Sequence, residues 1–114
     1  MIYTCIQKAS ASIVWEKGNL LSKAGLKASA NDSPDNPIKL TFITQKTGGI
    51  LKGNIDQSEL KRINDYVYLE VSMTGNVFLW TLIPKKDHIP TYLFQHKAYD
   101  LFGPFSITVA YECE

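Results

Sequence analysis

The sequence has very little arginine, and this shortage argues against one class of partner. Among its 114 residues, twelve basic side chains oppose eleven acidic ones for a formal net charge of +1, and Arg62 is the single arginine. Proteins that bind nucleic acid concentrate positive charge, and arginine is the residue that recognises phosphates and guanines with paired hydrogen bonds. We therefore expect no nucleic-acid partner.

Long hydrophobic segments are also lacking. The longest apolar run, VFLWTLI, is interrupted by Thr81 and is far shorter than the ~20 apolar residues that a membrane-spanning helix needs. The first residues, MIYTCIQKASAS, contain no basic segment followed by an apolar run and so do not resemble a signal peptide. These features predict a soluble, cytoplasmic protein without a membrane partner.

Cysteine is scarce, since only Cys5 and Cys113 are present and neither belongs to the CxxC spacing of zinc sites. For a cytoplasmic chain the expectation is two separate, reduced thiols. If the terminal strands are neighbours, the two sulfurs are able to meet instead. A bridge that closes almost the whole chain would then stabilise the fold by about 4 to 5 kcal/mol.

Alternation of apolar and polar residues is what the sequence has in abundance. Segments with this period of two are rich in Val, Ile, Thr and aromatic residues and are bounded by turn residues: MIYTCIQK, ASIVWEK, IKLTFITQ, DYVYLEVSM, NVFLWTLI, TYLFQ and FSITVAYECE. No helical crossovers separate them. The pattern predicts one all-β domain over residues 1–114, an antiparallel β-sandwich or small barrel of seven to eight short strands with one short helix.

The strongest local signal is VYLEVSMTGNVFLW, in which the Gly-Asn pair fits a two-residue type II′ turn. The register that follows places Thr74 opposite Val77, Val71 opposite Trp80 and Leu69 opposite Leu82. One face of this hairpin is then large and apolar and is the expected core. The opposite, mixed face is a candidate partner-binding surface, formed by Tyr66, Tyr68, Leu79 and Ile83.

The short helix is expected at NIDQSELKRIND. Asp56 suits the N-cap, Glu59 three residues later completes a capping box, and Ile55 with Leu60 forms a hydrophobic staple. Only Leu60 and Ile63 provide an apolar stripe. The helix should therefore be about two turns long and cover an edge or an end of the sheets.

Catalytic and metal-binding patterns are absent from the sequence. His88 and His96 both lie in PKKDHIPTYLFQH, but eight residues of extended chain separate them by about 26 Å, too far to share a metal ion. GxSxG, HExxH and phosphate-loop spacings do not occur, and KTGGILKG fits a hairpin turn. The loop NDSPDN has oxygen ligands suited to calcium, although the same residues form turns for local reasons. We expect no enzyme activity, no metal and no cofactor.

Two functions remain from these considerations. The first is a non-enzymatic binding module that contacts a protein partner or a second copy of itself, as accessory, inhibitor, immunity-type or assembly-subunit proteins do. The second is a lectin-like sandwich, with or without the assistance of calcium, in which aromatic rings stack on sugars. The sugar-binding candidates are Trp15, Tyr92 and Tyr99. A contiguous apolar patch on a sheet face favours the first function, whereas a lone ring beside NDSPDN favours the second.

Overall fold

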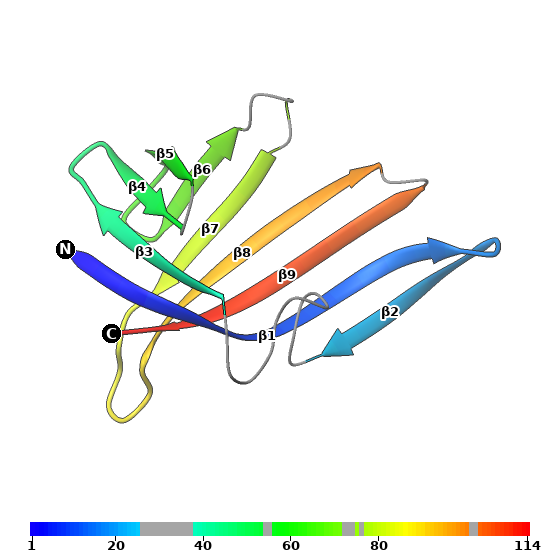
Figure 1. Ribbon diagram of the computed structural model, residues 1–114, viewed down its shortest axis with the longest axis horizontal. Coiled ribbons are helices and arrows are strands. Elements are labelled where there is room, and N and C mark those ends of the chain that lie inside the picture. Colours follow the sequence, from blue (N-terminus) through cyan, green and yellow to red (C-terminus); the bar gives the residue numbers. More distant parts are fainter. Residues whose placement is uncertain (26–37, 54–55, 72–74, 76, 101–102) are drawn as a thin grey trace.

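The computed structural model describes residues 1–25, 38–53, 56–71, 75, 77–100 and 103–114, and their regular structure is entirely β-strand. The expected all-β antiparallel class is thus confirmed (Figure 1). The strands are β1 (Ile2–Glu16), β2 (Asn19–Gly25), β3 (Lys39–Thr44), β4 (Gly48–Lys52), β5 (Gln57–Arg62), β6 (Val67–Val71), β7 (Val77–Ile83), β8 (Thr91–Asp100) and β9 (Pro104–Cys113).

The strands form a closed barrel and not two packed sheets. From β3 to β9 each strand pairs with the next in the sequence, and β1 closes the ring by pairing with β3 on one side and β9 on the other. The eight-stranded ring contains β1 and β3 to β9, whereas β2 pairs only with β1 in the described part of the chain. Of the two architectures that the sequence left open, the barrel is the one observed.

The long first strand explains why the ring is closed at one end only. Its residues Ile2–Ile6 pair with β3, whereas Ser10–Glu16 pair with β2 on the same edge. Between them the ladder to β9 shifts at Lys8, a β-bulge that bends the strand. We call the part around the β1–β3 pairing the closed end. We call the rest the extended sheet, which consists of β2 with residues 10–16, 104–109, 95–100 and 77–79 (Figure 1).

The predicted helix at NIDQSELKRIND is wrong, because residues Gln57–Arg62 form β5. Ser58, Leu60 and Arg62 point into the barrel with a period of two, and the strand pairs with five residues of β4. These cross-strand contacts outweigh the local capping signal, as tertiary context commonly does for short segments. Ile55, the other half of the expected hydrophobic staple, lies outside the described residues.

The predicted register of the β6–β7 hairpin is also wrong. Val71 lies opposite Val77 and Tyr68 opposite Trp80, so the connection is longer than a two-residue turn. The observed partner of Val71 is three residues away from its expected partner, Trp80. Because successive side chains of a strand point to opposite faces, this odd shift turns the other face of β6 toward the core. Thr74, expected opposite Val77, lies outside the described residues.

The core gathers at the closed end. Phe42 of β3 and Tyr68 of β6 meet edge to face with ring centroids 5.0 Å apart, and both are fully buried. Gly49 of β4 allows this packing, because a Cβ there would come within 3.3 Å of the Tyr68 ring. The buried apolar residues are Cys5, Leu40, Phe42, Leu60, Tyr68, Trp80, Leu82, Leu93, Val109, Tyr111 and Cys113.

A disulfide joins Cys5 of β1 to Cys113 of β9, across a separation of 108 residues. The terminal strands are therefore neighbours, and the expectation of two separate thiols is wrong. Thr4 and Glu114, beside the bridge, exchange two backbone hydrogen bonds of 3.0 Å. Cys5 and Cys113 therefore form the neighbouring non-hydrogen-bonded pair of the antiparallel ladder, in which the strands come closer, and their Cα atoms are 4.1 Å apart. The bridge fixes the closed end from inside the core.

Candidate functional site

The outward side of the sheet carries an unusual set of side chains. Across β6 to β9, the second half of β1, and β2, the outward-pointing described residues contain no Asp, Glu, Lys or Arg between Asp100 at the β8–β9 turn and the Lys8–Glu112 pair near the base. We call this surface the outer face. It consists of Val67, Leu69, Val71, Val77, Leu79, Thr81, Ile83, Tyr92, Phe94, His96, Ala98, Ser106, Thr108, Ala110, Ala9, Ala11, Ile13, Trp15, Leu20, Ser22 and Ala24.

The most apolar part of the outer face lies on β6 and β7. Val71 faces Val77 and Leu69 faces Leu79 across the hairpin. The side chains of Val71, Val77, Leu79 and Ile83 are 61%, 47%, 41% and 44% exposed. Neighbouring strands do not cover them, so the fold leaves a contiguous aliphatic patch in contact with solvent.

Beside this patch the outer face is hollowed over β8, β9, β1 and β2. The depression has a volume of about 390 Å³ and is lined by small side chains, among them Ala11, Ala24 and Ser106. His96 and Thr108 lie in it with the Nδ1 and Oγ1 atoms 2.6 Å apart, so the histidine is already engaged with a hydroxyl group. Small residues let another backbone approach this part of the sheet closely.

Between the margins set by Asp100 and by the Lys8–Glu112 pair, the charged side chains of these strands point to the opposite side. Glu70 accepts a hydrogen bond of 2.9 Å from the indole nitrogen of Trp80. Lys97 lies over the rings of Phe78 and Tyr99, with its Nζ atom 5.3 and 5.9 Å from their centroids. Charges within the strands are thus partnered on the inner side, while the outer face stays free of them.

The four predicted partner-binding residues are placed in three different environments. Leu79 and Ile83 lie on the outer face as expected. Tyr68 is fully buried against Phe42 and belongs to the core, whereas Tyr66 is 51% exposed in the turn before β6. Val71 was missed because the assumed two-residue turn gave β6 the wrong face, whereas Val77, which lies on the same side of β7 as Leu79, was not named among the candidates.

The predicted sugar-binding residues do not converge. Trp15 lies on the outer face near the tip of the β1–β2 hairpin and packs closely against Gly103, where a Cβ would approach its side chain to 2.9 Å. Tyr92 lies near the base and donates a 3.4 Å hydrogen bond to Glu112, and Tyr99 points to the inner side. The NDSPDN loop lies outside the described residues.

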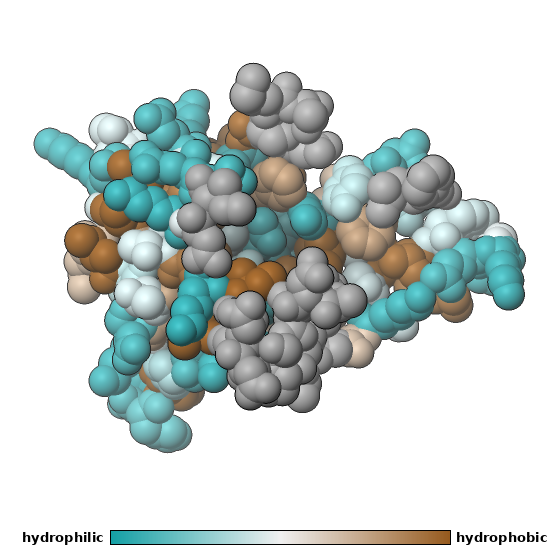
Figure 2. All heavy atoms as spheres, in the orientation of Figure 1, coloured by the Kyte–Doolittle hydropathy of each residue, from teal (hydrophilic) through white to brown (hydrophobic). Residues whose placement is uncertain are grey.

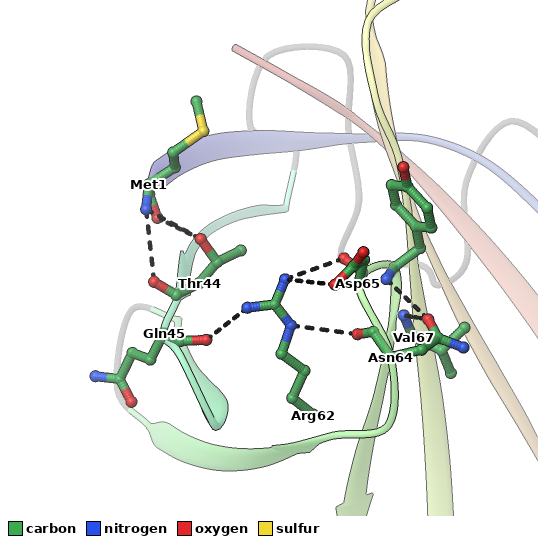
Figure 3. A network of polar contacts seen from close by, with 8 residues as sticks. Met1, Thr44, Gln45, Arg62, Asn64, Asp65 and Val67 are labelled. Atoms are coloured by element: carbon green, nitrogen blue, oxygen red, sulfur yellow. Dashed lines mark hydrogen bonds and ion pairs between the residues drawn. The ribbon is translucent and has the colours of Figure 1, made fainter.

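Arg62 is the centre of a polar network at the closed end (Figure 3). Its guanidinium group donates hydrogen bonds to the carbonyl oxygens of Gln45, Asn64 and Asp65 at 2.9, 3.2 and 3.5 Å. It also lies 5.7 Å from the centroid of the Tyr68 ring. The single arginine therefore ties the β3–β4 turn to the β5–β6 turn, and its donors are used within the fold.

Tyr68 contributes a buried polar atom to the same region. Its hydroxyl group has no hydrogen-bond partner among the described residues. Burial raises the pKa of Tyr68 above its usual value, an effect that the positive charge of Arg62 partly opposes. The hydroxyl group consequently stays neutral, and its desolvation costs free energy.

A second pocket lies at the base of the barrel beside the disulfide. Its volume is about 560 Å³, and Tyr3, Pro84, Pro90 and Thr91 are among the residues that line it. The hydrophilic residues of the β7–β8 loop gather next to it, at the bottom of the view in Figure 2. Its described lining residues include no acid paired with a base, so it offers a cavity without defined chemistry.

The two histidines lie on separate elements, His88 exposed in the β7–β8 loop and His96 on β8. In the described ranges, no three His, Cys, Asp or Glu side chains are arranged to hold a metal ion. The same ranges contain no helix with the length and apolarity needed to span a membrane. The chain matches no protein-family model, no curated protein and no solved structure.

Proposed function

We propose that this chain is a non-enzymatic binding module that docks a folded protein partner on the β6–β7 part of its outer face. The observation that carries the proposal is the contiguous exposure of Val71, Val77, Leu79 and Ile83 on a surface without charged side chains. The centres of protein interfaces are depleted in charge in the same way. The charged residues at the margins of the outer face and on the inner side of the sheet would then form the polar rim of the interface.

Burial by a partner would be favourable at these positions. Fully burying a valine or leucine side chain contributes about 1.5 to 3 kcal/mol, and folding buries only about half of each side chain in this patch. Covering the remaining half of all four side chains would therefore contribute about 3 to 6 kcal/mol of hydrophobic free energy to binding. The hairpin that holds them is anchored by the buried Tyr68 and Trp80, so little order has to be created on binding.

Carbohydrate binding has weaker support. A sugar site needs an exposed ring with hydrogen-bonding groups around it, and Trp15, Tyr92 and Tyr99 occupy three separate places on two sides of the sheet. Trp15 is half exposed but is surrounded by apolar and small residues of the outer face. The protein-binding proposal is therefore preferred.

The disulfide also bears on where the protein works. Disulfides persist in oxidising compartments and are reduced in the cytosol. We therefore favour an oxidising compartment over the cytoplasmic location that the sequence suggested. Because both cysteines are buried, cells are quenched in acid and free thiols are alkylated in denaturant, which should leave Cys5 and Cys113 unmodified. Alkylation of both cysteines under these conditions would restore the cytoplasmic assignment.

Site-specific photo-crosslinking tests the docking face directly. A benzoylphenylalanine residue in place of Leu79 should capture one partner reproducibly in extract of the source cells, whereas the same group in place of Glu59 on β5 should not. The captured protein is then purified, and its affinity is measured for the V77S/L79S variant. We expect binding to weaken at least tenfold.

The matched control is Ile63→Ser, which removes an equally exposed aliphatic side chain from the β5–β6 turn. It should leave the affinity unchanged. Equal weakening by both variants, or crosslinks that form only from position 59, would overturn the proposal. Circular dichroism of each variant checks that the barrel is intact, which is expected because these side chains face solvent.

A further inference from the structure

The strand β2 has one edge that pairs with no strand among the described residues, which we call its free edge. In the part of the chain that the structure describes, β2 pairs only with β1, and residues Asn19–Ala24 are all exposed. Proteins usually protect such edges with charges, prolines or bulges. The only charge on β2 is Lys23, and its Nζ atom lies 2.7 Å from Glu16, so this charge is largely neutralised. The edge is thus open to another strand.

The β1–β2 turn shows which backbone groups face the free edge. Lys17 and Gly18 have φ values of 50° and 83°, the left-handed pair of a two-residue type I′ turn. Such a turn makes its flanking residues, Glu16 and Asn19, a hydrogen-bonded pair, and hydrogen bonding to β1 then alternates along the ladder. The N–H and C=O groups of Leu20, Ser22 and Ala24 therefore point away from β1.

We infer that β2 pairs antiparallel with β2 of a second copy of this chain, across a two-fold axis at Ser22. In this register Ser22 faces its own symmetry mate, and Leu20 of each copy faces Ala24 of the other. All seven residues of β2 are then paired, with about six backbone hydrogen bonds formed by groups that have no partner among the described residues. The inference goes beyond the proposed function and does not depend on it.

The side chains favour this register over its alternatives. On the outer face the large Leu20 meets the small Ala24, and on the inner side Leu21 meets Lys23, whose charge Glu16 already neutralises. An axis at Lys23 would place two lysines directly opposite each other, which is destabilising. An axis at Leu20 or Leu21 would shorten the overlap towards the turn. The strand is therefore most complementary to itself at Ser22.

Pairing at this edge would also cover apolar surface. Leu20 and Leu21 are 58% and 41% exposed, and the apolar residues of the hairpin lie directly beside its hydrophilic tip, at the right of Figure 2. Trp15 faces Leu20 across β1 and β2. In the dimer the two outer faces would join into one continuous uncharged surface. Each β6–β7 patch would remain free, at the far margins of the combined sheet.

Sedimentation equilibrium of the purified, oxidised protein tests the inference. The wild-type chain and Ser22→Ala, which keeps the backbone donor, should be dimers at about 100 µM. Ser22→Pro removes one N–H group from the free edge and none from the β1 ladder. It should raise the dissociation constant of the dimer at least a hundredfold, with an unchanged circular dichroism spectrum. A monomeric wild-type chain at this concentration would overturn the inference, as would a Ser22→Pro variant that dimerises like Ser22→Ala.

Cysteine crosslinking tests the position of the axis. Ser22→Cys should form a disulfide with its own symmetry mate upon mild oxidation, because hydrogen-bonded partners of a ladder lie about 5.5 Å apart at Cα. Leu20→Cys alone should not crosslink, whereas a mixture of Leu20→Cys and Ala24→Cys should. Crosslinking of Leu20→Cys alone would contradict this register. The buried Cys5 and Cys113 are protected from exchange.

The same measurements separate this inference from the proposed function. The V77S/L79S variant should dimerise like the wild type, because its substitutions lie far from β2. If it is monomeric, the second copy occupies the β6–β7 patch and the edge assignment is wrong. If Ser22→Pro is monomeric and still binds the captured partner, both proposals stand independently.

Discussion

The closed end and the extended sheet use the same alternating strands with opposite results. At the closed end the ring brings inward residues from all sides together, so the five most completely buried large side chains, Trp80, Tyr68, Phe42, Leu93 and Cys5, lie in the ring. In the extended sheet β2 has no facing strand in the described residues, and its side chains stay exposed. Stability is therefore concentrated at one end, and the surface left for contacts at the other.

The largest expected effect tests the closed end. Reducing the Cys5–Cys113 bridge should lower the free energy of unfolding by about 4 to 5 kcal/mol, because the bridge closes a loop of more than a hundred residues. Urea denaturation with and without dithiothreitol measures this difference. A C5A/C113A variant should be insensitive to the reductant. If reduction changes the stability of the wild type by less than 1 kcal/mol, the closed end does not depend on its bridge.

Truncation of one side chain at each end sharpens the comparison. Phe42→Ala should destabilise the fold by about 3 to 5 kcal/mol, because it empties a fully buried site against Tyr68. Val77→Ala should cost less than about 1 kcal/mol, since nearly half of that side chain is in water. Both values come from urea unfolding at neutral pH. Similar losses for the two variants would mean that the β6–β7 patch is part of the core.

The sequence predicted strand content better than strand pairing. Phe78, Trp80 and Leu82 point inward as their alternation indicated, since a period of two is a local property. Assigning β6 to the correct face requires the length of its connection to β7. The Gly-Asn pair indicated a two-residue turn, and the observed connection is longer. Closure of the ring by β1, between β3 and β9, is a long-range pairing that no local pattern encodes.

The candidate site was predicted in part for the same reason. Leu79 and Ile83 were placed on an exposed face because the alternation of β7 was read correctly, and Tyr68 was misplaced together with β6. The helix predicted at NIDQSELKRIND failed for a different reason. Its capping residues are sound local signals. Pairing with β4 nevertheless makes the segment a strand, in which Ser58, Leu60 and Arg62 share the inward side. Residues 57–62 contain only one apolar residue, Leu60, so apolar alternation within the segment could not have indicated the strand.

A smaller effect is expected for the network at the closed end. Arg62→Ala should destabilise the fold by about 1.5 to 3 kcal/mol, because three carbonyl groups of two turns lose a charged donor. Arg62→Lys should recover only part of this, since an ammonium group lacks the planar fork. The matched control is Lys61→Ala, whose exposed side chain points outward from β5. Equal stability of the Arg62→Ala and Lys61→Ala variants in urea would show that the network is dispensable.

The smallest effect has the opposite sign. Tyr68→Phe should stabilise the fold by about 1 kcal/mol at pH 7, because it removes a buried hydroxyl group without a partner in the described residues and keeps the ring packed on Phe42. Tyr66→Phe, at an exposed position, should change little. Urea unfolding measures both. A destabilised Tyr68→Phe variant would show that the hydroxyl group finds a partner in solution.

The pH dependence gives a second readout of the same residue. The pKa of Tyr68 is raised in the folded chain, mainly by burial, so the unfolded chain loses this proton first as the pH rises. The contribution of Tyr68 to stability is thus fully present below the unfolded pKa of about 10 and is lost above it. The advantage of Tyr68→Phe over the wild type should therefore grow between pH 9 and pH 11, measured by urea unfolding at each pH. A constant difference across this range would mean that the hydroxyl group titrates as freely in the folded barrel as in the unfolded chain, and hence that water reaches the core at its closed end.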